Sequence, residues 1–454
     1  MSDHEFDIVV IGMGPGGEHV AEQLAKAGLS VAGVEARLVG GECPYWGCVP
    51  SKMMIRAADL ITEGRRIPGM AGESAVSPDW EPVAARIRAE ATDNWNDAVA
   101  ADRFTGAGGT LFRGHGRITA PGEVAVGAAV LRVRRGIVIN VGTSPAIPPI
   151  PGLAGTPFWT NREIIESEAV PPSLVVLGGG AIGAELAQVF ARFGARVSVV
   201  EALGQLLPAE EPESGELLAK IFAGEGMTVA TGARAESVSH DRAGGFAVRL
   251  TDGSEVRGDR LLVATGRTTD LASLGVGALG LDEAARWIPV DEHMRAAPGA
   301  WAIGDVVGHG AFTHMSMYHA GIVIDDILGR PHHPAEYHAV PRVTFTDPEI
   351  ASVGLTEAQA RQQIGAVSTG FSQIPASSRG WIHKAGNSGF IKLVADSSRG
   401  VLVGATSAGP MGGEVLSMLT LAVHAAVPLP RLGEMIYAYP TFHRAVADAL
   451  SQLG

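Results

Sequence analysis

A glycine-rich turn occurs twice in this sequence, each time between an apolar run and an amphipathic stretch. In the first copy, the apolar residues 6–11 precede Gly12, Gly14 and Gly17, and a later apolar run ends at Glu35. This order predicts a strand, a turn, a helix and a second strand. Such a unit places a pyrophosphate at the helix amino terminus and a ribose hydroxyl on the carboxylate.

The second copy has the same order and the same spacing. Gly178, Gly180 and Gly183 follow an apolar run, a helix is expected through Arg192, and the next strand ends at Glu201. The first glycine lies 23 positions before the acid in both copies, from 12 to 35 and from 178 to 201. One such turn could serve only tight helix–strand packing, but the repeat predicts two dinucleotide sites in two similar domains.

Cys43 and Cys48 are the only two cysteines among 454 residues. This count argues against a structural disulfide framework and favours a dedicated redox pair, with two buried thiols as the alternative. In an ideal helix their Cα atoms would be roughly 8 to 9 Å apart, too far for a disulfide. We therefore expect a distorted first turn, which Pro44 and Gly47 accommodate.

Residues 40–52 read Gly-Gly-Glu-Cys-Pro-Tyr-Trp-Gly-Cys-Val-Pro-Ser-Lys. This stretch resembles the redox helix of the class I flavoprotein disulfide reductases, the pyridine nucleotide-disulfide oxidoreductases that include lipoamide dehydrogenase, glutathione reductase and mercuric reductase. The resemblance implies that Cys43 meets the substrate, that Cys48 lies against the flavin and that Lys52 lies near the reactive flavin nitrogen. Tyr45 and Trp46 are larger than the residues usual there, and their role stays open.

The resemblance extends over essentially the whole chain. It implies that Glu185 lies near the nicotinamide and pairs with Lys52, and that Asp305 contacts the ribityl chain of FAD. Both nucleotide domains of this family end a strand in Ala-Thr-Gly; residues 264–266 match it, whereas Asn140 and Val141 depart from it. The implied cofactor-binding positions are Gly12, Gly14, Gly17, Glu35, Gly41, Lys52, Gly142, Gly178, Gly180, Gly183, Glu201, Gly266, Gly304 and Asp305.

The family places FAD in the first domain and the nicotinamide nucleotide in the second. Glu201 favours NADH, because a carboxylate would repel the 2′-phosphate of NADPH. Residues 202–208 contain no Arg or Lys to receive that phosphate, although NADPH stays possible.

The expected fold class is α/β, with two Rossmann-like domains and an α+β dimerisation domain. The expected boundaries are 1–150 for the FAD domain with its redox disulfide, 151–267 for the NAD(P) domain, 268–333 for the return to the FAD domain and 334–454 for dimerisation. The expected assembly is a homodimer.

The net charge of −13 and the pI near 5.5 argue against nucleic acid or an anionic membrane as partner. No run is long and apolar enough for a membrane helix, and the acidic start lacks a signal peptide, so a cytoplasmic location without membrane insertion is expected. His332, His333 and His338 have no cysteine or acid at ligand spacing, and no metal site is expected.

The carboxyl-terminal motif departs from the family. Dithiol-using members carry His-Pro-Thr-x-x-Glu, with the histidine as base, whereas this chain has Tyr439 in the base position and Arg444 in place of the acid. A tyrosine, with a reference pKa near 10, is a poor base at neutral pH. His443, expected one helical turn beyond Tyr439 on roughly the same face, is either a displaced base or a surface or dimer-contact histidine.

The combined expectation is an FAD enzyme that passes electrons from NADH through Cys43 and Cys48 to an acceptor such as a quinone, a dye or a small disulfide. A dihydrolipoamide dehydrogenase or other disulfide reductase using His443 as base is the alternative within enzymes. A non-catalytic nucleotide-binding redox sensor is the alternative from another class, against which the intact turns and cysteines argue. The sequence does not name the acceptor.

Overall fold

The computed structural model describes residues 2–241 and 244–453. The chain divides into two compact units, each described here by itself. The first unit comprises the described residues up to Ser51 together with Ala85–Ala146 and Arg267–Glu336. The second comprises Lys52–Ala84, Ile147–Gly266 and the described residues from Tyr337 onward. The boundaries expected from the sequence stay a prediction.

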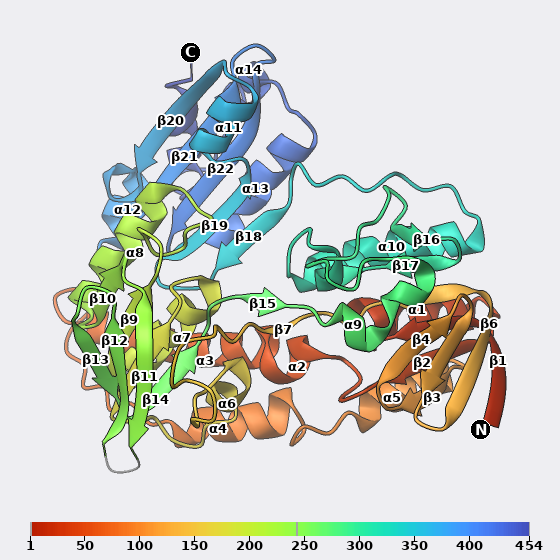
Figure 1. Cartoon of the computed structure of the whole chain (residues 1–454). Coiled ribbons are helices and arrows are strands. Elements are labelled where there is room, and N and C mark those ends of the chain that lie inside the picture. The colour runs from red at the N-terminus through yellow and green to blue at the C-terminus, as the bar shows by residue number, and fades with distance from the viewer. Residues whose placement is uncertain (1, 242–243, 454) are drawn as a thin grey trace. The chain divides into compact units, whose positions relative to one another are not determined.

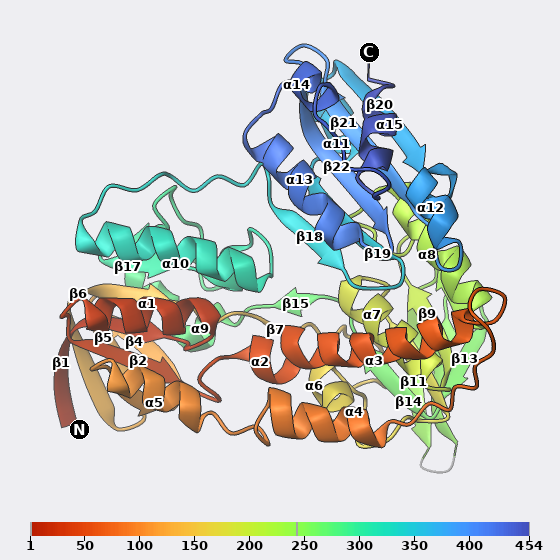
Figure 2. The same ribbon diagram turned by 180° about the vertical axis from the view of Figure 1, so that it is seen from behind.

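The first unit is built on a mostly parallel sheet with the order β16-β17-β6-β1-β2-β3, extended by the antiparallel strands β4 and β5. Helices α1 (Pro15–Lys26) and α10 (Thr313–Leu328) pack against each other, as both views show (Figures 1 and 2). The strands are β1 (Ser2–Ile11), β2 (Val31–Glu35), β3 (Thr110–Arg113), β4 (Gly116–Ala120), β5 (Glu123–Val126), β6 (Ala129–Ile139), β16 (Arg295–Ala297) and β17 (Ala300–Ala302). Helix α5 (Ala98–Gly106) packs on α1 and β3.

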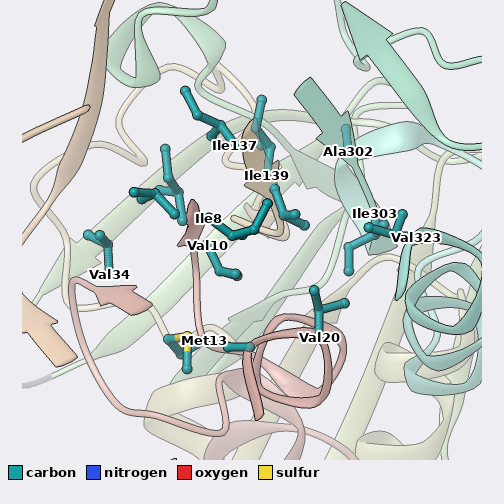
Figure 3. Close-up of a cluster of buried hydrophobic side chains, with 14 of the residues drawn as sticks. Ile8, Val10, Met13, Val20, Val34, Ile137, Ile139, Ala302, Ile303 and Val323 are labelled. Carbon is teal, nitrogen blue, oxygen red and sulfur yellow. The ribbon is translucent and has the colours of Figure 1, made fainter. Parts of the chain in front are cut away.

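A continuous apolar core lies between this sheet and its helices. Parallel strands covered on both faces have no polar side, which explains the uninterrupted apolar runs in β1, β2 and β6. Figure 3 shows Ile8, Val10 and Ile139 beside one another, with Val20 of α1 and Val323 of α10 close by. All five side chains are buried. The core therefore fixes the carboxyl ends of the strands, where the glycine turn begins.

The described residues of the second unit form three sheets. The parallel sheet has the order β10-β9-β8-β14 and carries helices α7 (Ala181–Arg192) and α8 (Pro212–Gly224), and a three-stranded antiparallel sheet, β11-β12-β13, follows. Their bounds are β8 (Ser173–Leu177), β9 (Arg196–Glu201), β10 (Thr228–Thr231), β11 (Ala235–Asp241), β12 (Gly245–Leu250), β13 (Glu255–Gly258) and β14 (Arg260–Val263). Strand β14 ends at Val263, so the Ala-Thr-Gly of residues 264–266 follows the strand. Arg267 and Thr268 form a separate short strand, β15, paired with β7 (Ser144–Pro145) in the first unit.

The carboxyl-terminal part of the second unit is an antiparallel sheet with the order β18-β19-β22-β21-β20, followed in sequence by helices α13, α14 and α15. The bounds are β18 (Pro341–Thr344), β19 (Glu349–Gly354), β20 (Val367–Gln373), β21 (Phe390–Asp396), β22 (Val401–Gly409), α13 (Gly412–His424), α14 (Leu429–Gly433) and α15 (Arg444–Leu450). Two Rossmann-like sheets and this antiparallel domain confirm the expected fold class. No helix of the described residues has both the length and the apolar character that a membrane crossing needs.

Candidate functional site

The first glycine turn joins β1 to α1 and is closed by Glu35. Gly12 has a φ of +91°, and a side chain there would collide with the carbonyl oxygen of Asn140. The Glu35 carboxylate accepts the backbone N–H of Met13 at 2.8 Å and that of Arg37 at 2.7 Å. Burial raises the pKa of Glu35, and the two amide donors oppose that shift. The Glu35 side chain thus holds the turn through main-chain amides.

The second turn repeats this arrangement between β8 and α7. Gly178 has a φ of +103°, and a side chain there would collide with the carbonyl oxygen of Ala264. The Glu201 carboxylate accepts the N–H of Gly179 and that of Leu203, each at 2.7 Å. The repeat predicted from the sequence is therefore present down to individual hydrogen bonds.

Both helix starts fit a dinucleotide. Gly14 caps α1 and Gly180 caps α7 without any side-chain cap, and helix amino termini of this kind suit a pyrophosphate. Gly17 and Gly183 lie so close to the first glycine's carbonyl in each turn that a side chain would collide with it. Asn140, the departure from the family, donates its Nδ2 hydrogen to the Gly12 carbonyl at 3.1 Å.

The redox stretch is a broken helix. Helix α2 (Glu42–Trp46) ends at Gly47, whose backbone leaves the helical region, and α3 (Cys48–Arg66) restarts directly after it. The distortion expected between the cysteines is therefore found at Gly47. Gly41, with a φ of +70°, is the capping residue before α2 and packs against the Cα atom of Gly14. The redox stretch thus abuts the first glycine turn.

The two cysteines lie beside a threonine from α10. Cys48 is exposed, and its Sγ lies 3.5 Å from the Oγ1 of Thr313. A hydrogen bond to Cys48 together with burial raises the pKa of the Cys43 thiol. Cys48 is the first residue of α3, and a helix amino terminus stabilises a thiolate. Nothing in the sequence pattern pointed to Thr313.

Lys52 and Glu185 are joined in the second unit. The Lys52 Nζ donates to Glu185 Oε2 at 2.7 Å, and the Phe345 N–H donates to Oε1 at 2.8 Å. The ammonium also lies 4.7 Å from the centre of the Phe345 ring. Because Glu185 is buried and both its oxygens are occupied, it fixes the position of the Lys52 charge.

Asp305 lies in a polar cluster of the first unit. Its Oδ2 accepts the hydroxyl of Thr143 at 2.9 Å, and Arg267 donates to that same hydroxyl oxygen at 2.5 Å. Burial raises the pKa of Asp305, an effect that Arg267 opposes. Gly142 and Gly266, next to these two partners, both have positive φ.

A buried histidine that the sequence did not single out supports Gly304. The His319 Nδ1 accepts the Gly304 N–H at 3.1 Å, and its side chain is completely buried. Burial lowers the pKa of His319 to about 4, so the ring is neutral near pH 7. The only signal in the sequence was that His319 is the second of two histidines, after His314, in the largely apolar stretch that follows the Gly304-Asp305 pair.

The carboxyl-terminal motif corrects one expectation. His443 was expected one helical turn beyond Tyr439 on a common face, but α15 begins only at Arg444 and the two residues lie in turns before it. Pro440 explains the difference, because a residue before proline is kept out of the helical conformation. Tyr439 is 71% exposed.

Comparisons with known proteins agree with this geometry. Residues 6–321 match the family described as pyridine nucleotide-disulphide oxidoreductase, and residues 340–450 match its dimerisation domain. The chain is 33% identical to a dihydrolipoyl dehydrogenase of Chlorobaculum tepidum, covering 99% of this chain and 98% of that protein. It is also 33% identical to a mercuric reductase of Acidithiobacillus ferrooxidans, covering 96% and 80%.

Two solved structures have a similar fold. The HOCl-induced flavoprotein disulfide reductase RclA of Escherichia coli has a TM-score of 0.85 at 26% identity, covering 99% of this chain and 100% of that one. LpdA of Mycobacterium tuberculosis has a TM-score of 0.86 at 26% identity, with the same coverage.

Proposed function

The chain belongs to the pyridine nucleotide-disulphide oxidoreductase family, and on that premise we propose that it oxidises NADH and passes two electrons through the Cys43–Cys48 pair to an acceptor such as a quinone, a dye or a small disulfide. The family uses FAD and NAD(P)H, so the chain is a flavoprotein oxidoreductase with a redox-active cysteine pair. Its dimerisation domain implies a homodimer.

The observation that carries the proposal is the position of the cysteine pair. Cys43 and Cys48 flank the break at Gly47, and Gly41 places the same stretch against the glycine turn. FAD, when bound, supplies the hydride and electron chemistry. Two electrons and two protons convert the disulfide to two thiols, and a quinone that takes both electrons and both protons re-forms the disulfide.

Other residues of the chain have supporting roles in this proposal. Asp305, Glu35 and the first glycine turn would hold FAD, and Glu201 with the second turn would hold NADH. Lys52, fixed by Glu185, would place a positive charge where negative charge develops during hydride transfer.

The choice of NADH rests on Glu201. Its carboxylate, with each oxygen already accepting one backbone amide, suits two ribose hydroxyls and repels a phosphate. We also propose a cytoplasmic location. The two cysteines of the sequence both belong to the redox pair, and in a reducing compartment a disulfide persists only when it is catalytic.

Among these acceptors we favour a quinone or a dye over a disulfide because of Tyr439. An exposed tyrosine hydroxyl is a weak base near neutral pH, so it would not activate a dithiol substrate. The similarity to dihydrolipoyl dehydrogenases supports a second candidate, the oxidation of dihydrolipoamide with His443 as base.

Steady-state oxidation of NADH by one purified sample tests both candidates. Quinones and dyes should be reduced readily, and lipoamide, low-molecular-weight disulfides and mercuric ion slowly, with His443→Ala unchanged throughout. Strong disulfide turnover that drops about 10²- to 10⁴-fold in His443→Ala would instead establish the second candidate.

A further inference from the structure

Three metal-ligating side chains meet in the first unit, at positions far apart in the sequence. They are His293 in the turn before β16, Asp326 in the last turn of α10 and His332 in the segment after that helix. One ligand atom from each lies within 4.8 Å of the other two. None of the three belongs to the nucleotide and disulfide site described above. We propose that they form a site for a divalent transition metal ion of the Zn²⁺ type.

The distances suit one ion. His293 Nδ1 and His332 Nε2 are 3.0 Å apart, and His332 Nε2 and Asp326 Oδ1 are 4.0 Å apart. Ligand atoms that each lie about 2.1 Å from a tetrahedral Zn²⁺ ion are separated by about 3.4 Å. Each of these two separations thus needs to change by only about half an ångström for the atoms to share the ion. Two imidazoles and a carboxylate are a donor set typical of Zn²⁺.

The second histidine has its tautomer set by the backbone. His332 Nδ1 lies 3.1 Å from the carbonyl oxygen of Arg330, which can only accept, so the ring hydrogen is on Nδ1 and Nε2 presents a lone pair to the site. His293 Nδ1 then donates to that nitrogen when no ion is bound. On metal binding the His293 hydrogen would move to Nε2, which faces Glu292 Oε1 at 3.6 Å.

The carboxylate is buried and oriented. The Asp326 side chain is 5% exposed, and it accepts hydrogen bonds from Trp301 Nε1 at 2.8 Å and from Arg295 Nε at 2.9 Å. The Arg295 guanidinium also pairs with Oδ1, the oxygen nearest His332. That guanidinium competes with a cation for Oδ1, so the two imidazole nitrogens would carry most of the binding, and such a donor set favours Zn²⁺ over Mg²⁺, which demands oxygen.

The backbone around the ligands is already fixed. Asp291 Oδ1 accepts the N–H groups of His293 and Arg295, each at 2.9 Å, and shapes the turn. The Ala335 N–H donates to the Glu292 carbonyl at 2.8 Å and ties the segment after α10 to that turn. A bound ion would add a further link between these same segments, and it would stabilise the folded state more as its concentration rises above its Kd.

Calorimetric titration of tag-free holoenzyme with ZnCl₂ tests the proposal, in a Cys43→Ser/Cys48→Ser background that removes competing thiolates. One ion per chain should bind, and His332→Ala, His293→Ala and Asp326→Asn should each weaken binding at least about 10- to 100-fold. His333→Ala, a change to the adjacent exposed histidine, is the matched control and should bind as the parent does.

A thermal-unfolding series gives a second readout. Zn²⁺ should raise the melting temperature of the parent and of His333→Ala, should raise that of His332→Ala much less, and Mg²⁺ should raise none of them. His332 lies outside any helix or strand, so its variant is expected to fold, and the flavin spectrum will show whether it does. Absence of stoichiometric Zn²⁺ binding, or binding that survives His332→Ala and Asp326→Asn unchanged, would overturn the proposal.

Discussion

The carboxylate of Glu201 accepts the backbone amide of Gly179 at 2.7 Å, which ties the end of β9 to the turn that opens α7. This bond places a negative charge beside the expected ribose of the nicotinamide nucleotide. Replacing Glu201 with Ala and Ala202 with Arg should shift coenzyme preference toward NADPH by roughly 10- to 100-fold, by removing repulsion and adding a charged hydrogen-bond donor. Kinetic constants for both coenzymes measure the shift.

Ala202→Arg alone is the control that keeps the carboxylate, and it should help NADPH less than the pair of changes. Glu236→Ala removes an exposed glutamate of the same unit and should leave the preference unaltered. A wild-type enzyme that already prefers NADPH would refute the role given to Glu201.

The cysteine pair predicts the electron capacity of the enzyme. Anaerobic titration with NADH should consume two two-electron equivalents in the wild type, one for FAD and one for the disulfide of Cys43 and Cys48. A thiolate-to-flavin charge-transfer absorption should appear during the titration. Cys48→Ser should retain FAD, lose that absorption and take up one equivalent. Uptake of a single equivalent by the wild type would exclude the disulfide from the electron path.

The ion pair of Lys52 and Glu185 predicts a kinetic effect. Lys52→Met removes a preorganised charge and should slow reduction by NADH about 10²-fold in stopped-flow measurements. Glu185→Gln keeps an oxygen for the Phe345 amide and should fold normally while slowing the same step. Lys26→Met breaks an exposed pair with Glu22 and serves as control. Equal rates in all three variants would leave the Lys52 charge without a catalytic role.

His319 predicts a loss of stability in acid. Its folded pKa of about 4 lies below the ordinary value of 6.5, so the unfolded chain binds the extra proton more readily. The stability due to the neutral ring is complete above pH 6.5 and falls as the pH drops toward 4, by roughly 3 kcal/mol in total. His319→Asn keeps an acceptor for Gly304 and should show a smaller drop in urea midpoint between pH 7 and pH 5.

Exposed His333→Asn provides the comparison for that measurement and should follow the wild type. Identical pH dependence in wild type and His319→Asn would show that His319 does not titrate in this range.

Restoring the family motif tests the meaning of Tyr439. Tyr439→His with Arg444→Glu should raise disulfide-linked activity, because a positioned imidazole contributes roughly 10²- to 10⁴-fold as a general base. Dye reduction should stay unchanged and is the internal control. No gain in disulfide turnover from a correctly folded variant would show that the site differs in more than its base.

The glycine turns could be predicted from the sequence because their determinants are local. Gly12 and Gly178 need left-handed backbone conformations, and Glu35 and Glu201 close the turns at a constant distance along the chain. The break between the cysteines was also predictable, because Gly47 stands between two residues that an ideal helix keeps apart.

Contacts between distant segments could not be predicted in the same way. Thr313 reaches Cys48 only because α10 returns to the first sheet, and His319 is paired with Gly304 by tertiary packing. The sequence showed no acid at ligand spacing from His332, because Asp326 and His293 come close to it only in the folded chain. The position of His443 was wrong because a helical spacing was assumed across Pro440.

Glu35 and Glu201 bond to main-chain amides, and this makes mutational tolerance around them uneven. The partner positions Arg37 and Leu203 contribute only a backbone N–H, so almost any residue other than proline can satisfy the same bond. A saturation library read out by flavin retention should therefore be intolerant at Glu35, where the acceptor is lost, and permissive at Arg37. A comparison of relatives would reveal the acid and miss the partner on which it depends.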